Sequence, residues 1–394
     1  MTSLFRWDGR FSSNAWRLAN EFCKERRVFY VNYQFTLKDL IAEWDGTQVQ
    51  SRRGKLLGRG GWSRPEGFPP NLWSVDAPVF LPNNKLSDGA LYRMLAKHND
   101  RRFFNTVMRM IRHFEIKDFT WLNVYNPYIG HYPPKGFNPA LKVYYTVDAI
   151  SEDNYTKIHG PRLEQKLMRE ADFVMGTSKE LVRMAGNYSD DVHFLPNAAD
   201  IDLFKKANDK NISVPDDISD IDTPVIMYTG NISLRINYPL LVKTAKRHTD
   251  KTLVMVGPVD NRAFKGQELY DLPNVRFTGT KEIEQLPAYL SRADCVIIPF
   301  ELTKLTASIY PLKINEYLAS GRPTVLTRFS DLSEFDHVTY VSDSDEEFMD
   351  NIQKAIDENT PQKETERVKA SEGNTWQART KTFHKLEDQY RNRV

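Results

Sequence analysis

Short apolar runs alternate with amphipathic stretches along the second half of the chain. The apolar runs are long enough for buried strands and too short for helices. They lie at 224–230, 252–257, 274–279, 295–300 and 323–327. The amphipathic stretches have helical spacing and lie at 238–248, 282–293 and 311–320. This alternation predicts an α/β fold, a mostly parallel sheet covered by helices on both faces.

The first half repeats the pattern less regularly. Helical spacing occurs at 14–25, 89–113, around 160–171 and from 179 onward. Strand-like runs occur at 28–33, 119–125, 142–148, 173–178 and 192–197. A second doubly wound parallel sheet is therefore expected, which makes two sheet domains.

The boundary between two domains is expected in a polar stretch without periodicity. Residues 205–222 have this character and contain a proline, as a linker does. We therefore predict an N-terminal domain at 1–204, a linker at 205–222 and a C-terminal domain at 223–375. The last segment, 376–394, predicts a charged helix that packs back on the first domain with Trp376 as its anchor.

Composition narrows the class of protein. The 394 residues are 40% hydrophobic and 27% charged, as in an ordinary globular protein. No apolar stretch reaches the length of a membrane span, and the start of the chain lacks the apolar segment of a signal peptide. The two cysteines, Cys23 and Cys295, exclude a disulfide framework. A cytoplasmic location is therefore expected.

Several familiar site motifs are missing or have a simpler explanation. A G-x-G-x-x-G fingerprint after a strand is absent, because Gly58, Gly60 and Gly61 lie in an arginine-rich loop. We therefore expect no cofactor and no hydride transfer. The pair Asp343 and Asp345 has the D-x-D spacing of a metal site, but its surroundings favour a helix start. No His/Cys cluster has zinc spacing, and no metal is expected.

The stretch SIYPLKINEYLASGRPTV, at 308–325, predicts a loop that leads into a helix. Pro311 suits the first turn of that helix, and Gly321 with Pro323 ends it. The first turn of a helix offers unpaired N–H groups and the positive end of its dipole. Since the loop follows a strand of a parallel sheet, it is a candidate diphosphate site.

Three charged residues accompany this loop. Lys304 and Lys313 add positive charge, and the carboxylate of Glu316 suits hydrogen bonding to two vicinal hydroxyls, such as those of a ribose. The alternative is that Lys313 and Glu316 are ordinary exposed helix residues.

A second loop, YTGNISLRIN at 228–237, follows the first strand of the C-terminal domain. Gly230 permits close backbone approach to a ligand, and Arg235 can bind phosphate through two parallel hydrogen bonds. The alternative is a plain strand–helix turn with a surface arginine.

Together these motifs resemble GT-B glycosyltransferases of the family-4 or family-1 type. The resemblance rests on P-x-K-x-x-EYLA-x-G-x-P at 311–323, FVMGTSKEL at 173–181, HFLPNAADIDLF at 193–204 and YTGNI at 228–232. It implies a GT-B fold, with two Rossmann-like domains across a cleft. It also implies that a nucleotide sugar binds the second domain, and that a glycan or lipid-linked glycan acceptor of a bacterial surface-polysaccharide pathway binds the first.

The resemblance further implies roles for individual residues. Glu316 would hold the ribose, the backbone of Tyr310–Leu312 with Arg235 would hold the diphosphate, and Thr280–Ile283 would border the base. The expected donor-binding residues are Gly230, Asn231, Arg235, Thr280, Lys281, Ile283, Lys304, Thr306, Ser308, Tyr310, Pro311, Leu312, Lys313 and Glu316. Ser308 departs from the pattern, because the family often has a second glutamate there.

The implied reaction moves a sugar from a UDP- or GDP-linked donor to a hydroxyl without a metal. Asp148, at the end of a predicted strand, is the first candidate for an acid/base residue, and His131 is the second. For both, a capping or surface role is the alternative. Two other functions stay open, a GT-B epimerase or phosphorylase and a non-catalytic carbohydrate-binding protein.

The positive charge is concentrated in the first 113 residues, although the whole chain is only +2. The segments 52–64 and 101–114 are both basic, and the second mixes arginine with apolar residues as an interfacial helix does. We therefore expect peripheral contact with an anionic membrane and no nucleic acid partner. The alternative is a core helix with solvated arginines.

Overall fold

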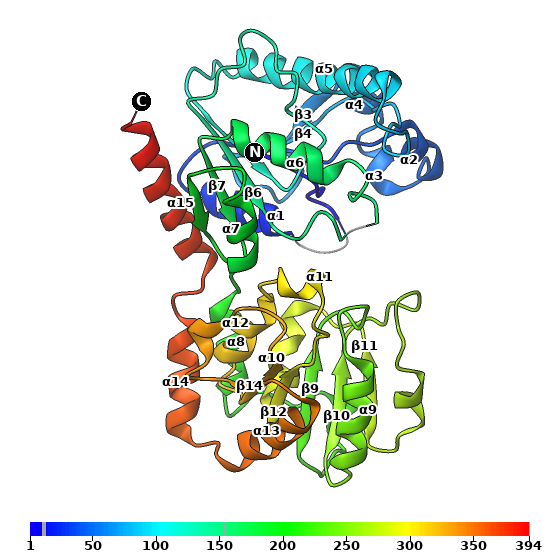
Figure 1. The fold of residues 1–394 in the computed structure, drawn as a ribbon, viewed down its shortest axis with the longest axis vertical. Coiled ribbons are helices and arrows are strands. Elements are labelled where there is room, and N and C mark those ends of the chain that lie inside the picture. Colours follow the sequence, from blue (N-terminus) through cyan, green and yellow to red (C-terminus); the bar gives the residue numbers. More distant parts are fainter. Residues whose placement is uncertain (10–12, 153, 394) are drawn as a thin grey trace. The chain divides into compact units, whose positions relative to one another are not determined.

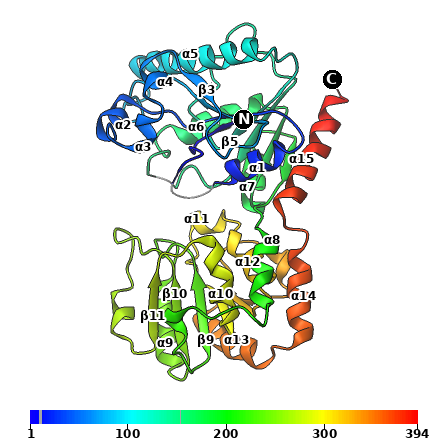
Figure 2. The ribbon, with the colours of Figure 1, turned by 180° about the vertical axis from the view of Figure 1, so that it is seen from behind.

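The computed structural model describes residues 1–9, 13–152 and 154–393. The chain forms two compact units, drawn in Figures 1 and 2. The N-terminal unit comprises Met1–Pro196 and Arg379–Val394, and the C-terminal unit comprises Asn197–Ala378. Each unit has the α/β architecture that the sequence predicts.

The N-terminal unit contains an eight-stranded sheet in the order β3-β4-β2-β1-β5-β6-β7-β8. Its strands are β1 (Thr2–Ser3), β2 (Val28–Val31), β3 (Gly61–Ser63), β4 (Leu72–Asp76), β5 (Thr120–Val124), β6 (Leu141–Thr146), β7 (Phe173–Gly176) and β8 (Val192–Phe194). All neighbours are parallel except β3 and β4. The carboxyl ends of the parallel strands therefore share one edge.

Helices cover this sheet in both ribbon views. They are α1 (Asn14–Phe22), α2 (Leu37–Ala42), α3 (Thr47–Gln50), α4 (Arg53–Leu57), α5 (Ala90–His113), α6 (Gly160–Glu170) and α7 (Lys179–Ala185). The apolar side chains of the second half of α5 are buried, among them Phe103, Phe104, Val107 and Met110. This favours the alternative of a core helix, because these side chains already pack in the core while polar residues such as Arg101 and Arg112 face water.

The last helix, α15 (Trp376–Arg391), packs within the N-terminal unit from Arg379 onward. Phe383 contacts Phe22 with ring centroids 4.9 Å apart, and Glu387 pairs with Arg26 at 2.6 Å. Trp376 itself is half-buried and belongs to the C-terminal unit. The anchor of α15 is therefore a buried face centred on Phe383 and Glu387, rather than Trp376.

The C-terminal unit contains a six-stranded, all-parallel sheet in the order β11-β10-β9-β12-β13-β14. Its strands are β9 (Val225–Thr229), β10 (Thr252–Val256), β11 (Val275–Gly279), β12 (Cys295–Ile298), β13 (Thr324–Thr327) and β14 (Tyr340–Ser342). Its helices are α8 (Ile201–Lys205), α9 (Tyr238–Arg247), α10 (Leu286–Ser291), α11 (Lys304–Ala307), α12 (Leu312–Ala319), α13 (Asp345–Asp357) and α14 (Pro361–Ser371). The strand order reverses between β9 and β12, which is where such sheets bind ligands.

The stretch expected as a linker is folded. Residues 205–222 contain the turns Lys206–Asn208 and Asp216–Ile218, and their apolar side chains Ala207, Ile218 and Ile221 are buried in the core of the C-terminal unit. The division between the units therefore lies at 196/197 rather than at 204, because these sparse apolar residues dock on the second sheet.

The acidic stretch at 343–347 begins a helix. Ser344 caps α13 by accepting a hydrogen bond from the N–H of Glu347, and Asp345 lies in the first turn. Asp343 pairs with Arg328 at 2.6 Å, and Asp345 with Lys243 at 2.7 Å. The described residues hold no group of three or more His, Cys, Asp or Glu side chains that could bind a metal.

None of the helices in the described ranges is both long enough and apolar enough to cross a membrane.

Candidate functional site

Two loops of the C-terminal unit are bonded together where the strand order reverses. The N–H of Asn237 donates to the carbonyl of Pro299 at 2.8 Å, and the N–H of Glu301 donates to the carbonyl of Arg235 at 2.9 Å. An isolated bridge joins Ile236 to Phe300. These bonds fix the backbone of Arg235 beside the carboxyl end of β12.

Three glycines lie at the carboxyl ends of strands of this sheet. Gly230 and Gly257 directly follow β9 and β10, and Gly279 is the last residue of β11. Gly230, Gly257 and Gly279 have φ of 122°, 142° and 72°, which favour glycine. A Cβ on Gly257 would lie 2.0 Å from the carbonyl oxygen of Gly230, and a Cβ on Gly230 would lie 3.3 Å from Nζ of Lys313. Glycine at these positions lets two backbone segments and a lysine come close together.

The helix α12 begins without a side-chain cap. Its N-cap is Pro311, which has extended backbone angles and offers no side-chain acceptor. The first-turn N–H groups, such as those of Leu312 and Lys313, therefore remain open to an anion at the positive end of the helix dipole.

Lys313 is the most perturbed cation of this region. Its Nζ lies 5.1 Å from the ring centroid of Tyr228 and 5.2 Å from that of Phe300. Burial lowers its pKa to about 8, while Glu316 acts to raise it and Arg235 to lower it. Within the described part of the chain its ammonium has no hydrogen bond and no ion pair. A half-buried lysine with a lowered pKa and no direct ion pair is a candidate for a functional residue.

The structure brings four of the expected donor residues to this place. Gly230 and Lys313 are in contact distance, and Arg235 and Glu316 are close enough to shift the pKa of Lys313. Arg235 and Glu316 are both half-buried. Lys304 is exposed at the first position of α11. Anion-binding groups and a carboxylate are thus combined on two adjacent loops and one helix.

Other expected donor residues use their side chains to hold the local backbone. Ser308 is buried, and its hydroxyl donates to the carbonyl of Leu305 at 2.7 Å. Thr306 is buried and bonded to Thr303, in a capping box at the start of α11. Their side chains support the loop rather than face an open site.

Five more expected residues are placed as follows. Lys281 pairs with Asp217 at 2.7 Å, which raises the pKa of the lysine. The buried hydroxyl of Tyr310 bonds to the side chain of Asn315 at 3.2 Å. Asn231 and Thr280 are exposed, and Ile283 begins a turn, Ile283–Gln285. Exposed Thr280 remains compatible with a border for a base, whereas Lys281 already has a partner.

In the N-terminal unit, a loop after β5 holds His131 in a neutral state. Asp100 accepts hydrogen bonds from the N–H groups of Gly130 at 2.8 Å and Tyr132 at 2.6 Å. Nε2 of His131 lies 2.6 Å from the carbonyl of Pro127, so Nε2 carries the proton. Nδ1 is buried without a partner, and burial lowers the pKa of His131 to about 4. Such a histidine can accept a hydrogen bond at Nδ1 but is a weak base.

Asp148 follows β6, the strand beside β5, and is half-buried. The sheet therefore presents His131 and Asp148 from neighbouring carboxyl ends.

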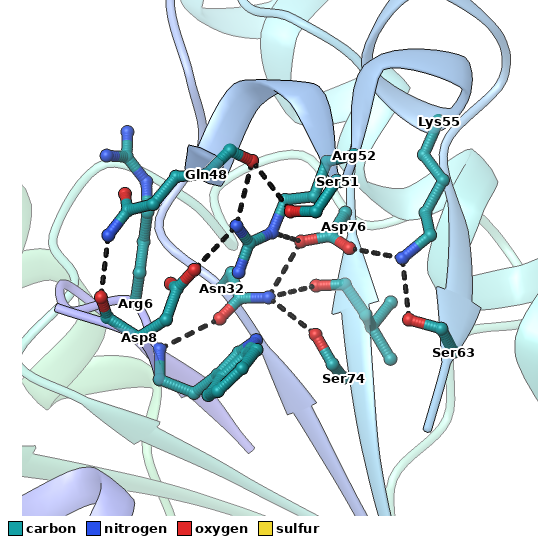
Figure 3. Close-up of polar contacts among 12 residues, drawn as sticks. Arg6, Asp8, Asn32, Gln48, Ser51, Arg52, Lys55, Ser63, Ser74 and Asp76 are labelled. Atoms are coloured by element: carbon teal, nitrogen blue, oxygen red, sulfur yellow. Dashed lines mark hydrogen bonds and ion pairs between the residues drawn. The ribbon is translucent and has the colours of Figure 1, made fainter. Parts of the chain in front are cut away.

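A buried polar network that sequence reasoning missed lies at the end of β4, as Figure 3 shows. Asp76, with 3% of its side chain exposed, accepts from Arg52 Nε at 3.0 Å, Lys55 Nζ at 2.7 Å and Asn32 Nδ2 at 2.7 Å. Arg52 also pairs with Asp8 at 2.8 Å. The basic residues of this segment were expected to contact an anionic membrane, but Arg52 and Lys55 neutralise the buried carboxylate of Asp76 and hold α4 on the sheet. Basic residues followed by a lone aspartate at a strand end were the available signal.

Comparison with known proteins supports the fold and one domain. Residues 223–358 match the family model "Glycosyl transferases group 1". A relative in Bacillus subtilis (strain 168), TuaH, is named for a glycosyltransferase role in teichuronic acid biosynthesis. It is 28% identical over 179 residues, which cover 43% of this chain and only 44% of that relative.

Solved structures match over almost the whole chain at low identity. The sucrose-phosphate synthase of Thermosynechococcus elongatus has a TM-score of 0.64 at 16% identity and covers 96% of this chain and 93% of its own. Anabaena Alr3699/HepE, solved in complex with UDP, has a TM-score of 0.61 at 14% identity and covers 98% and 99%. At these identities the likeness establishes the fold, which is GT-B as expected.

Proposed function

We propose that this chain, whose residues 223–358 are a glycosyl transferases group 1 domain within a GT-B fold, transfers a sugar from a nucleoside diphosphate donor to a hydroxyl group. The observation that carries the proposal is Lys313. A lysine without a counter-ion, half-buried beside the uncapped start of α12, needs an anion to complete its surroundings. A diphosphate supplies that anion.

The donor would bind with its diphosphate against the first turn of α12. Lys313 and Arg235 supply charge, and Gly230 lets the phosphate oxygens approach the backbone. Glu316, one turn further along α12, would accept hydrogen bonds from the ribose hydroxyls, and Thr280 and Ile283 would border the base. The UDP found in the Anabaena structure favours a uridine donor.

Transfer requires that the nucleoside diphosphate leaves with its negative charge stabilised. Main-chain N–H groups and two cations that are already in position do this without reorganisation. We propose that these groups suffice without a bound metal. Loss of turnover on adding a chelator would contradict this part of the proposal.

The acceptor would be a glycan or a lipid-linked glycan bound by the N-terminal unit. Asp148 would accept a hydrogen bond from the reacting acceptor hydroxyl and take up its proton, and Nδ1 of neutral His131 would accept a hydrogen bond from a second hydroxyl of the acceptor. Contact with an anionic membrane would depend on exposed arginines, since the large apolar side chains Phe103, Phe104, Val107 and Met110 in the second half of α5 are buried.

Calorimetric titration with UDP and with GDP tests donor binding. We expect one of them to bind, and we expect Glu316→Ala and Lys313→Met to weaken that binding at least about tenfold, the effect of about 1.4 kcal/mol. Lys246→Met is the matched control, because Lys246 is exposed and paired with Glu268. Failure of both nucleotides to bind the unmodified protein would end the proposal.

Product analysis then separates transfer from related reactions. With a nucleotide sugar and a glycan acceptor, we expect the sugar on the acceptor and free nucleoside diphosphate. If the product were an epimerised nucleotide sugar, or a sugar phosphate formed with inorganic phosphate, the chain would catalyse another GT-B reaction instead of transfer.

A further inference from the structure

Four arginines line one depression of the N-terminal unit. The depression has a volume of about 370 Å³ and is lined by Gly58, Arg59, Pro78, Arg102, Asn105, Arg109 and Arg112. Its residues come from the loop between α4 and β3, from the segment after β4 and from one face of α5. The two basic segments of the sequence thus meet at one place.

No carboxylate lines this depression, and none balances its charge. Among the described residues, Arg59, Arg102, Arg109 and Arg112 form no ion pair. By contrast, Arg26 of the same unit pairs with Glu387, and both Arg52 and Lys55 pair with Asp76. Positive charges within one such depression lie inside a Debye length of each other, so an anion relieves their repulsion.

The backbone of the loop and the side chain of Arg109 are held in place before any ligand arrives. Gly60 has a φ of 71° and packs against Thr106, whose hydroxyl donates to the carbonyl of Arg59 at 3.1 Å. Nη2 of Arg109 donates to the carbonyl of Gly60 at 3.1 Å. Nε of Arg102 is buried and has no hydrogen-bond partner in the described chain. The loop and the helix therefore bring together a set of guanidinium donors that is not satisfied within the described chain.

We infer that this depression, the four-arginine pocket, binds a phosphate group. Guanidinium groups match the oxygens of phosphate through parallel, charge-assisted hydrogen bonds. The volume lies at the lower end of ligand sites, and Pro78 is the single apolar side chain of the lining, which excludes an acyl chain. The pocket is separate from the proposed donor residues, all of which lie in the C-terminal unit, so it stands whether or not the chain transfers sugars.

The phosphate can be the headgroup of a membrane lipid or part of a soluble phosphate ester, and two binding arms separate these sources. The first titrates the full chain with inorganic phosphate, against chloride at equal ionic strength. The second measures co-sedimentation with phosphatidylcholine vesicles that do or do not contain phosphatidylglycerol. The double variant Arg59→Gln/Arg112→Gln removes two cations whose side chains make no hydrogen bond to the described chain.

We expect the double variant to bind at least about tenfold more weakly in one arm or both, as loss of charge-assisted pairs implies. Arg183→Gln, on exposed α7, is the control and should bind like the unmodified protein. Lys313→Met should also leave binding in the vesicle arm intact, which distinguishes the pocket from the donor site. Binding in the vesicle arm alone assigns a lipid headgroup, and binding of free phosphate assigns a soluble ester. Equal binding by the double variant and the unmodified protein in both arms overturns the inference.

Discussion

Lys313 is expected to lower stability in the position where we propose that it binds the donor. Below pH 8 the folded chain holds its ammonium against Tyr228 and Phe300, and burial lowers its pKa from 10.5 to about 8. Because the unfolded chain binds more protons between these values, stability should rise as the pH increases from 8 to 10.5.

We therefore expect Lys313→Met to stabilise the C-terminal unit at pH 7, by about 1–2 kcal/mol after allowance for the partial exposure of Lys313. The gain in stability of the variant should vanish near pH 10.5. Nucleotide binding by the unmodified protein should weaken as the pH rises, because Lys313 loses its charge. Urea unfolding at pH 7 and pH 10.5 measures the first effect. A variant that is less stable at pH 7 would show that Lys313 is a structural residue.

Glu164 in the N-terminal unit provides a pH effect of opposite sign. This buried carboxyl accepts from the hydroxyls of Tyr144 at 3.2 Å and Thr146 at 2.9 Å, and burial raises its pKa from 4.5 to about 7. The folded chain then binds more protons than the unfolded chain between pH 4.5 and 7. Its contribution to stability is complete below pH 4.5 and is lost as the pH rises to 7.

Glu164→Gln should therefore be up to about 3 kcal/mol more stable than the unmodified protein at pH 8 and equal to it near pH 4.5. The amide mimics the protonated acid and needs no ionisation. Chemical unfolding at the two pH values measures the difference. Glu170→Gln, exposed on the same helix, is the control and should change stability by less than about 0.5 kcal/mol.

The burial and the contacts of single side chains were the least predictable features from the sequence. Lys313 and Glu316 could be chosen from their place at the start of a helix. The burial of Lys313 depends on aromatic rings from β9 and from the loop after β12, which no local pattern brings together. In the same way, Ser308 is a departure from a motif in sequence, but only the fold shows its hydroxyl bonded to Leu305.

At the scale of elements, the glycine turns after the strands of the second sheet set the shape of the site. Gly257 and Gly279 both have positive φ, but their surroundings differ. A Cβ on Gly257 would meet the carbonyl of Gly230 at 2.0 Å, whereas a Cβ on Gly279 would meet nothing within 4 Å.

We expect Gly279→Ala to destabilise the protein by about 1–2 kcal/mol, the backbone strain alone. Gly257→Ala should lower stability by roughly 2–5 kcal/mol and weaken nucleotide binding, because the loop of Gly230 must move. Thermal unfolding and UDP titration of both variants check this. Equal effects of the two substitutions would show that the contact between the turns is unimportant.

Elements with a strong pattern were predictable, and short or polar ones were not. The inner strands β9, β10, β12 and β13 of the C-terminal unit are buried on both faces, so they read as continuous apolar runs. By contrast β1 is only Thr2–Ser3, and β3 is a half-buried edge strand, so neither produces a pattern. The three apolar residues of 205–222 that dock on the core are too sparse to show periodicity.

At the scale of the whole molecule, α15 connects the end of the chain to the first unit. Phe383, Leu386 and Tyr390 are buried there, and Glu387 pairs with Arg26. Each of these large side chains contributes about 1.5–3 kcal/mol by its burial, so together they approach the stability of a whole domain.

A chain that ends at Ala378 should therefore lose the unfolding transition of the N-terminal unit or show it at a much lower temperature. Its UDP affinity should stay within about twofold, since all proposed donor residues lie in the C-terminal unit. Calorimetry and UDP titration of the truncated chain test the two statements separately. Loss of UDP binding, together with an unchanged unfolding transition of the N-terminal unit, would contradict both expectations.

The chain leaves the first unit at Pro196 and returns to it at Arg379, whose Nε donates to the carbonyl of Pro196 at 2.9 Å. On the ribosome, the early part of that unit emerges long before the helix that completes it. The second unit, which is continuous in sequence, can finish folding in the meantime. During synthesis the apolar surface of the first unit that α15 covers therefore stays exposed until the end of the chain is made. This surface makes the first unit the part of this protein most in need of a chaperone.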